Sequence, residues 1–222
     1  MIPYLIGIAG PSGAGKSVLC RKLQTSFANV SRLKLDDFFK DIEEVPLRGE
    51  WQDWDEPSSL HWDDLVRAVQ DLKRGHHAIV PNYSRRFDRR IGEKCVFPAP
   101  IILVDGFMSL YDERLRELLD LKLFYSLSED SQRKRRRERQ PWVMEGYLHE
   151  VMIPAARKYI IPTADHADFV INAESAASVV ATQSIEILTS TIPDRLKKLD
   201  SAGDFRTASL EDSISDTASI NA

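Results

Sequence analysis

Residues 10–17 read Gly10-Pro11-Ser12-Gly13-Ala14-Gly15-Lys16-Ser17, and this stretch decides the fold. It fills every fixed position of the Walker A pattern, G-x-x-x-x-G-K-[ST]. Glycines suit such a loop because its backbone N–H groups must turn inward around phosphate oxygens, which requires positive φ angles and close approach. We expect Lys16 to reach the β- and γ-phosphates of ATP and the Ser17 hydroxyl to coordinate Mg²⁺.

The segments on either side of the loop support this interpretation. Tyr4 to Ala9 is a short apolar run that predicts a strand. After the loop, one helical stripe carries Val18, Leu19, Leu23 and Phe27. A helix in this position directs its positive end at a bound phosphate. The alternative is a chance match in a tight turn.

The rest of the chain alternates strand and helix patterns. Further strands are predicted at Val30 to Leu35, His77 to Pro81, Ile101 to Val104, Leu121 to Tyr125 and Phe169 to Ile171. Helices are predicted at Trp62 to Arg74, Asp112 to Leu119, Glu129 to Arg139, Tyr147 to Ile160 and Ser175 to Leu188. This alternation predicts an α/β fold of the P-loop NTPase type, a mostly parallel sheet with helices on both faces.

The 222 residues fit one domain of ordinary size. We predict a P-loop domain over residues 1–199, with a lid at about 129–147, and a polar excursion from Lys40 to His61. Residues 200–222 are rich in Ser, Ala, Asp and Thr and hold few large apolar side chains. They predict a disordered tail, because such a segment buries too little apolar surface to offset its ordering entropy.

Composition excludes several classes of protein. The formal net charge of −4 provides no global basic field that would draw the chain to nucleic acid or anionic lipid. Cys20 and Cys95 form no CxxC pair, which argues against a zinc cluster or disulfide framework. No apolar run approaches the roughly 18 residues of a membrane span. We therefore expect a cytoplasmic protein with no nucleic-acid or membrane partner.

Acidic residues follow two of the predicted strands. Asp36 and Asp37 close the second strand, and Asp105 follows Ile101 to Val104. Open α/β sheets bind ligands at the carboxyl edge of their strands. A carboxylate there can take the proton from an acceptor hydroxyl as it attacks a γ-phosphate, while a helix cap or an indirect Mg²⁺ contact is the alternative. Asp105 is the candidate to hold Mg²⁺ or its water, with a structural turn role as the alternative.

A basic run occupies one predicted helix, Arg133-Lys134-Arg135-Arg136-Arg137-Glu138-Arg139. Phosphoryl transfer needs cations over the migrating charge, and a late helix in a P-loop domain is where a lid would supply them. The alternative is a nucleic-acid patch, which should bind RNA with steep salt dependence.

Together these residues resemble the uridine kinase and nicotinamide riboside kinase group of P-loop kinases, from about Pro3 to Leu188. Leu35-Asp36-Asp37-Phe38-Phe39-Lys40 is similar to the family stretch QD-[SD]-F-[YF]-K, whose first Asp is the catalytic base. Trp54-Asp55-Glu56-Pro57 is similar to [FW]-D-x-P, whose Asp binds the ribose hydroxyls. Pro81-Asn82-Tyr83 resembles P-x-Y, whose Tyr lines the base pocket. Val104-Asp105-Gly106-Phe107 resembles the family's [ED]-G turn.

The resemblance implies a kinase that transfers the γ-phosphate of ATP·Mg²⁺ to the 5′-hydroxyl of a ribonucleoside, of the nicotinamide riboside or uridine/cytidine type. It implies catalytic roles for Asp36, Lys16, Arg136 and Arg139. It places the nucleotide on Gly10, Pro11, Ser12, Gly13, Ala14, Gly15, Lys16, Ser17, Val18 and Arg135. It places the nucleoside on Asp36, Phe39, Trp54, Asp55, Tyr83 and Arg136, and the metal on Ser17, Asp36 and Asp105.

One segment departs from the resemblance. Uridine and cytidine kinases carry Y-D-F-x-x-H-x-R, whereas here Tyr83 is followed by Ser84, Arg85 and Arg86, with Asp88 at the position of the His. Arginines near this turn could form an anion site for a sugar phosphate, namely Arg85, Arg86, Arg89 and Arg90. Pantothenate is another candidate acceptor. A switch that binds a nucleotide without a small acceptor is the rival of a different class.

Overall fold

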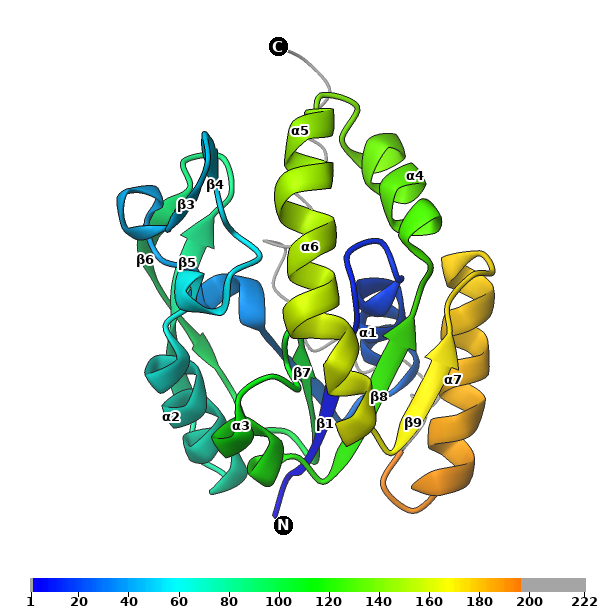
Figure 1. Ribbon diagram of the computed structural model, residues 1–222. Helices are drawn as coiled ribbons and strands as arrows, with labels where there is room; N and C mark the ends of the chain where they lie inside the picture. The colour runs from blue at the N-terminus through cyan, green and yellow to red at the C-terminus, as the bar shows by residue number, and fades with distance from the viewer. Residues whose placement is uncertain (1, 197–222) are drawn as a thin grey trace.

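The computed structural model describes residues 2–196, and the predicted tail at 200–222 lies outside the described residues. Its centre is a five-stranded sheet in the order β2-β7-β1-β8-β9. The strands are β1 (Tyr4–Ala9), β2 (Val30–Lys34), β7 (Ile101–Asp105), β8 (Leu121–Ser126) and β9 (Phe169–Asn172). All neighbouring strands pair in parallel, which confirms the α/β prediction (Figure 1).

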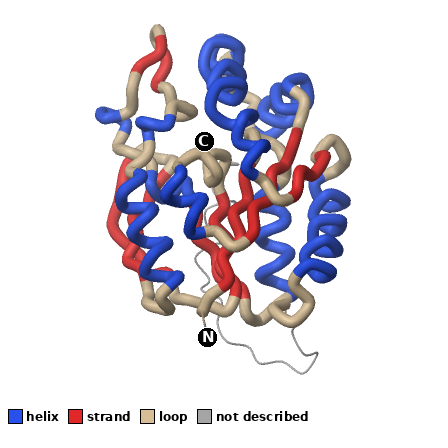
Figure 2. The backbone as a smooth tube through the Cα atoms, turned by 60° about the horizontal axis from the view of Figure 1, so that its bottom comes forward, coloured by secondary structure: helices blue, strands red, loops and turns tan. Residues whose placement is uncertain are grey.

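Helices cover both faces of this sheet, as the red strands and blue helices of Figure 2 show. Successive side chains of a strand point to opposite faces. Leu5 of β1 therefore joins one core, with helices α2 (Trp62–Lys73) and α3 (Glu113–Leu118). Ile6 joins the other core, with α1 (Lys16–Ser26) and α7 (Ala177–Thr191). Every residue of β7 is buried, as expected of a strand covered twice.

A long helix crosses the front of the sheet in Figure 1 and carries the labels α5 (Glu145–Tyr147) and α6 (Ile153–Ala155). A wider π turn over Leu148–Met152 joins these parts, and a second one over Ala156–Ile160 follows α6. A 3₁₀ turn over Ile161–His166 ends the helix. Pro154 has no N–H to donate to the preceding turn, which explains the loosened winding around it. Within residues 2–196, no helix is both long enough and apolar enough to cross a membrane.

Two hairpins lie outside the central sheet, and the sequence patterns did not predict either one. β5 (Ala78–Ser84) pairs antiparallel with β6 (Arg89–Val96), whereas only a short strand at His77 to Pro81 was predicted. β6 is largely polar and exposed, so it lacks the apolar alternation by which strands are found. β3 (Leu47–Arg48) and β4 (Trp51–Gln52) form a second, very short hairpin within the excursion.

The parallel strands end at one edge, and their ends bring the predicted site together. β1 runs into the glycine loop, and β7 ends at Asp105, which lies beside Ile8 in the sheet register. β2 ends at Lys34, one residue earlier than predicted, because a 3₁₀ turn over Leu35–Phe38 takes over the backbone. β8 leads to α4 (Glu129–Arg139), the predicted lid helix.

Candidate active site

The glycine loop turns its backbone inward, as its sequence predicts. Gly10, Gly13 and Gly15 have φ angles of +131°, +84° and +91°. A Cβ on Gly10 would lie 2.4 Å from the carbonyl oxygen of Tyr125, so a larger residue does not fit there. The Lys16 ammonium lies within the loop and donates to the carbonyl oxygens of Gly10 at 2.6 Å and Pro11 at 3.0 Å. Burial lowers the pKa of Lys16.

Two predicted metal residues meet at the foot of the loop. The Ser17 hydroxyl donates to Asp105 Oδ2 at 3.3 Å. A hydroxyl and a carboxylate are the hard oxygen donors that Mg²⁺ prefers, so these residues fit the ion that the loop motif implies. No group of three or more His, Cys, Asp or Glu residues within 2–196 could hold a metal. Phosphate oxygens and water would therefore complete the coordination, as is usual for Mg²⁺ bound with a nucleotide.

Arg32 is a residue that sequence reasoning missed at this site. Its Nε donates to Asp105 Oδ2 at 3.1 Å, and its Nη2 also forms an ion pair with that oxygen. The pair is nearly buried, with side-chain exposures of 10% and 5%. It forms because β2 and β7 are neighbours in the sheet, which no local pattern reveals.

The two adjacent acids after β2, Asp36 and Asp37, have side chains in different surroundings. Asp36 accepts a hydrogen bond from Arg85 Nη2 at 2.7 Å. Desolvation alone would raise the pKa of Asp36, but the positive charges of Arg85 and Lys16 lower it below its ordinary value. Asp37 is buried, pairs with Lys94 of β6 at 2.9 Å, and has its pKa raised by burial. Asp36 thus shares the loop's surroundings, and Asp37 anchors the β5–β6 hairpin.

Aromatic side chains form the wall beyond Asp36. Phe39 is central to this cluster, with ring centroids 5.4 Å from Trp54, 5.7 Å from Tyr83 and 6.0 Å from Phe107. Three of these rings, Phe39, Trp54 and Tyr83, belong to predicted substrate residues, and the structure brings them together. The Tyr83 hydroxyl is buried and has no hydrogen-bond partner among residues 2–196, which is unusual for a buried polar atom.

Asp55 connects the polar excursion to the long helix. Its Oδ2 accepts a hydrogen bond of 2.7 Å from the hydroxyl of Tyr147. Burial raises the pKa of Asp55, while this hydrogen bond and the charge of Arg136 lower it. Sequence reasoning assigned Tyr147 only to the start of a helix, because its partner Asp55 is far away along the chain. A partly buried carboxylate held in this way can accept hydrogen bonds from hydroxyl groups of a ligand.

The basic helix α4 presents one of its faces to the glycine loop. Arg135 Nη1 donates to the Gly13 carbonyl oxygen at 3.1 Å. Arg136 Nη1 and Arg139 Nη2 lie 3.4 Å and 3.0 Å from Ser12 Oγ. The lid helix is therefore folded against the loop, with these three guanidinium groups beside Ser12 and Gly13.

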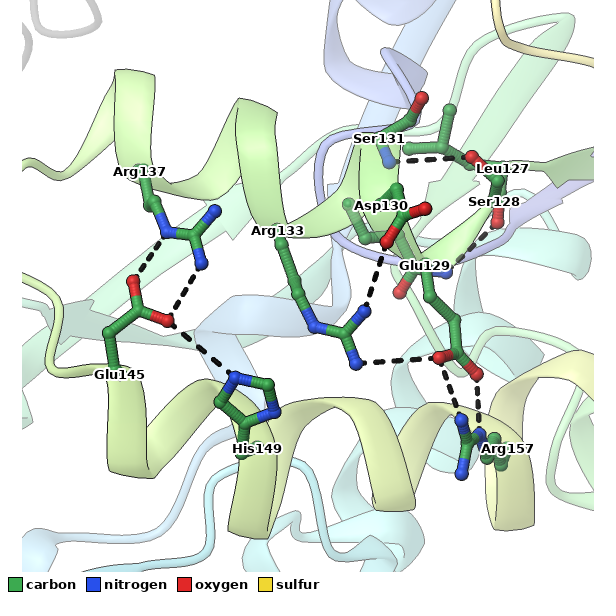
Figure 3. A network of polar contacts seen from close by, with 11 residues as sticks. Leu127, Ser128, Glu129, Asp130, Ser131, Arg133, Arg137, Glu145, His149 and Arg157 are labelled. Atoms are coloured by element: carbon green, nitrogen blue, oxygen red, sulfur yellow. Dashed lines mark hydrogen bonds and ion pairs between the residues drawn. The ribbon is translucent and has the colours of Figure 1, made fainter.

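The opposite face of α4 joins the long helix through ion pairs (Figure 3). Arg137 pairs with Glu145 in the first turn of that helix. Glu129, at the start of α4, pairs with both Arg133 and Arg157. The basic run thus divides by helical geometry, because residues three or four apart share a face. This half of the run is engaged within the protein, which weakens the nucleic-acid alternative.

The arginines of the β5–β6 hairpin do not form one cluster. Arg85 alone among them contacts Asp36, and its guanidinium lies 5.3 Å from the centroid of the Phe39 ring. The other three have partners elsewhere: Arg86 lies over Phe87, Arg89 pairs with Glu43 and Arg90 pairs with Asp64. An anion site built from several of these side chains is therefore not assembled.

Comparisons with known proteins agree with this geometry. The Phosphoribulokinase / Uridine kinase family matches residues 5–180 of the chain. The uridine kinase of Halobacterium salinarum is 31% identical over 187 residues, covering 79% of this chain and 82% of that protein. Uridine-cytidine kinase A of Dictyostelium discoideum is 28% identical over 206 residues, which cover 88% of this chain but only 40% of that protein.

A solved structure shares the fold. The structure of a possible uridine kinase from Bacillus stearothermophilus superposes with a TM-score of 0.57 at 19% identity, covering 77% of this chain and 89% of that one. The family match spans the glycine loop, the acidic doublet, both hairpins and the lid helix. The chain is therefore a phosphotransferase that belongs to the phosphoribulokinase and uridine kinase family.

Proposed function

We propose that this protein transfers the γ-phosphate of ATP to the 5′-hydroxyl of a ribonucleoside. The observation that carries the proposal is the position of Asp36. Its carboxylate lies close enough to Lys16 for each charge to shift the pKa of the other. Arg85, which donates a hydrogen bond to this carboxylate, also lies over the Phe39 ring of the aromatic cluster. A carboxylate linked in this way to a phosphate-binding lysine and to an aromatic cluster is placed to receive a hydroxyl proton as phosphoryl transfer occurs.

Each part of the site has a role in this reaction. The loop amides and Lys16 bind the phosphates, and Arg136 and Arg139 stabilise the charge that develops on the transferred group. Asp36 orients the 5′-hydroxyl and accepts its proton, while Asp55 accepts hydrogen bonds from the ribose hydroxyls. When bound through Ser17 and Asp105, Mg²⁺ would neutralise charge on the phosphate oxygens. The docked lid excludes water, which would otherwise compete with the acceptor.

A nucleoside fits the acceptor side better than a sugar phosphate does. A sugar phosphate needs a second anion site. Of the four hairpin arginines only Arg85 contacts Asp36, and this ion pair already neutralises its charge. The wall of Phe39, Trp54 and Tyr83 instead offers aromatic surface on which a heterocycle can pack. Relatives described as uridine kinases support the same acceptor class.

An acceptor panel tests the proposal directly. The protein is incubated with ATP·Mg²⁺ and, in turn, with uridine, cytidine, nicotinamide riboside, ribulose 5-phosphate and pantothenate, and products are identified by mass spectrometry. We expect a nucleoside 5′-monophosphate and ATP turnover that depends on the nucleoside. If the protein turned over ATP only with ribulose 5-phosphate or pantothenate, the acceptor would be a sugar phosphate or pantothenate and the nucleoside proposal would be wrong. ATP hydrolysis that ignores every acceptor would instead favour the nucleotide switch.

Replacing Tyr147 by phenylalanine tests the assignment of Asp55. Without the 2.7 Å hydrogen bond, Asp55 loses a group that orients it. A net hydrogen bond contributes about 0.5–1.5 kcal/mol, so we expect KM for the nucleoside to rise by about 2- to 10-fold while kcat changes little. Steady-state kinetics at saturating ATP measure both constants.

Tyr159→Phe is the matched control for this substitution. Tyr159 lies on the same long helix, and its hydroxyl also bonds a carboxylate of the excursion, Glu56, at 2.7 Å. If the two variants raise KM equally, the effect reflects general docking of the excursion, and Asp55 has no special role in binding the nucleoside.

A further inference from the structure

Two hydrogen-bond donors lie next to each other at the aromatic cluster, on the side of the site where the phosphoryl acceptor would bind. Tyr83 lies near the end of β5, and Arg85 is the first residue of the turn that follows this strand. Both contact Phe39, with the Tyr83 ring centroid at 5.7 Å and the Arg85 guanidinium at 5.3 Å from the ring centroid. Each also perturbs the pKa of the other, as neighbouring groups do.

The hydroxyl of Tyr83 is available to form a hydrogen bond with a ligand. It is buried, yet it has no hydrogen-bond partner among residues 2–196. Leaving such a group unsatisfied costs about 1–3 kcal/mol, so a bound acceptor that satisfies it gains affinity. Arg85 has capacity for the same ligand, because its guanidinium carries five N–H donors and the bond to Asp36 uses the Nη2 group.

The chemistry of the pair is asymmetric, and this asymmetry identifies what it can bind. A tyrosine hydroxyl can donate or accept, whereas a guanidinium only donates. An oxygen acceptor on the ligand can therefore satisfy Arg85, but an amino group cannot and would leave two donors facing each other. This position differs from the histidine-containing turn of the resembled pyrimidine kinases, because Asp88 and Arg85 replace that pattern here.

Local charges favour a neutral oxygen over an anion. The charges of Asp36 and Asp55 both act on Arg85. Burial raises the pKa of Asp88, and the charge of Arg85 offsets part of this rise. The ion pair with Asp36 already balances the charge of Arg85. A carbonyl group can use the donors of Arg85 without bringing a further negative charge into this region.

We propose that Tyr83 and Arg85 together read carbonyl oxygens on the nucleobase and reject bases that present an amino group to them. The inference rests on the proposed nucleoside kinase function and names the class of base: keto rather than amino heterocycles. Uridine and cytidine are the matched probes, because they differ only in the 4-keto or 4-amino group and the protonation of N3.

The test is the ratio of kcat/KM for uridine to that for cytidine with ATP·Mg²⁺. A hydrogen bond to a charged group contributes enough for about a 10- to 100-fold preference, and we expect uridine to be preferred by this factor. Arg85→Gln should bring the ratio close to 1, because the glutamine amide can donate to a keto group or accept from an amino group. Arg85 also contacts Asp36, but any loss through that contact affects both nucleosides alike and leaves the ratio unchanged.

Two further variants complete the design. Arg86→Gln changes the neighbouring arginine, which lies over Phe87, and should keep the wild-type ratio. Arg85→Lys retains a side chain that only donates and should keep a preference for uridine. The inference is wrong if the wild-type ratio is near or below 1, or if Arg85→Gln leaves it unchanged. Equal loss of the preference in the Lys and Gln variants would also overturn it.

The outcomes separate this inference from the function on which it rests. Equal phosphorylation of uridine and cytidine contradicts the reading of the base but supports the nucleoside kinase. If neither nucleoside yields a 5′-monophosphate, the proposed function itself is wrong.

Discussion

Replacing Lys16 by alanine is expected to lower kcat by about 10³-fold or more. The ammonium group is buried within the loop and lies among the carbonyl oxygens of Gly10 and Pro11, where the phosphates of ATP would approach. A cation that stabilises the transferred phosphoryl group acts in a water-poor site, where removal of one charged contact costs about 3–4 kcal/mol of transition-state stabilisation. Initial rates at saturating ATP and nucleoside measure the loss.

Lys22→Ala is the control for this substitution. Lys22 belongs to the same helix α1, but its ammonium bonds the Ser178 carbonyl oxygen and the Thr182 hydroxyl of α7. We expect its kcat to stay within about 2-fold of the wild type, since exposed contacts of this kind contribute little. Thermal denaturation of both variants separates lost chemistry from lost folding. A folded Lys16→Ala protein with the wild-type rate would contradict the role of the loop.

The sequence was most informative where function and fold depend on neighbouring residues. The glycine loop needs its residues in one continuous order, so the motif predicted both the positive φ angles and the strand and helix around it. The apolar run at Ile101 to Val104 likewise predicted a strand covered on both faces, because burial on two sides leaves no polar alternation. Local chemistry is sufficient in such places.

Contacts between segments that are far apart in the chain could not be predicted from the sequence. Arg32 meets Asp105 only because two parallel strands are neighbours, and Tyr147 meets Asp55 only because the long helix crosses the excursion. The β5–β6 hairpin was not predicted for a related reason. β6 is largely exposed and its residues do not alternate between apolar and polar, so only its pairing with β5 identifies it as a strand. That missed hairpin is also what brings Arg85 to Asp36.

The basic run of Arg133 to Arg139 shows why composition alone does not assign a function to charged residues. Six cations in seven residues could form a nucleic-acid patch or a lid, and the sequence left both open. The structure turns Arg135, Arg136 and Arg139 toward the loop and ties Arg133 and Arg137 to acidic partners. Helical spacing allows this division, but only the positions of the loop and the long helix determine which arginines face which side.

Asp36→Asn is expected to lower kcat by roughly 10²- to 10⁴-fold, the usual contribution of a positioned general base. Asparagine keeps the shape of the side chain and an oxygen that can accept from Arg85, but it cannot take a proton at neutral pH. Because Arg85 and Lys16 hold the pKa of Asp36 below its ordinary value, the wild-type carboxylate is ionised throughout the neutral range. Single-turnover measurements with bound ATP and nucleoside report this chemical step directly.

Asp37→Asn supplies the sharpest comparison, because the two acids are adjacent in sequence and differ only in where the fold directs them. Asp37 pairs with Lys94 and is only 7% exposed, so we expect its loss to lower the free energy of unfolding by about 1–3 kcal/mol and to leave the single-turnover rate within a few-fold. Asp36 is half exposed and should show the reverse pattern, a lost rate with near-normal stability. If the rate were lost in Asp37→Asn and kept in Asp36→Asn, the base would be the second acid of the doublet, and the geometry around Lys16 would not describe the reacting state.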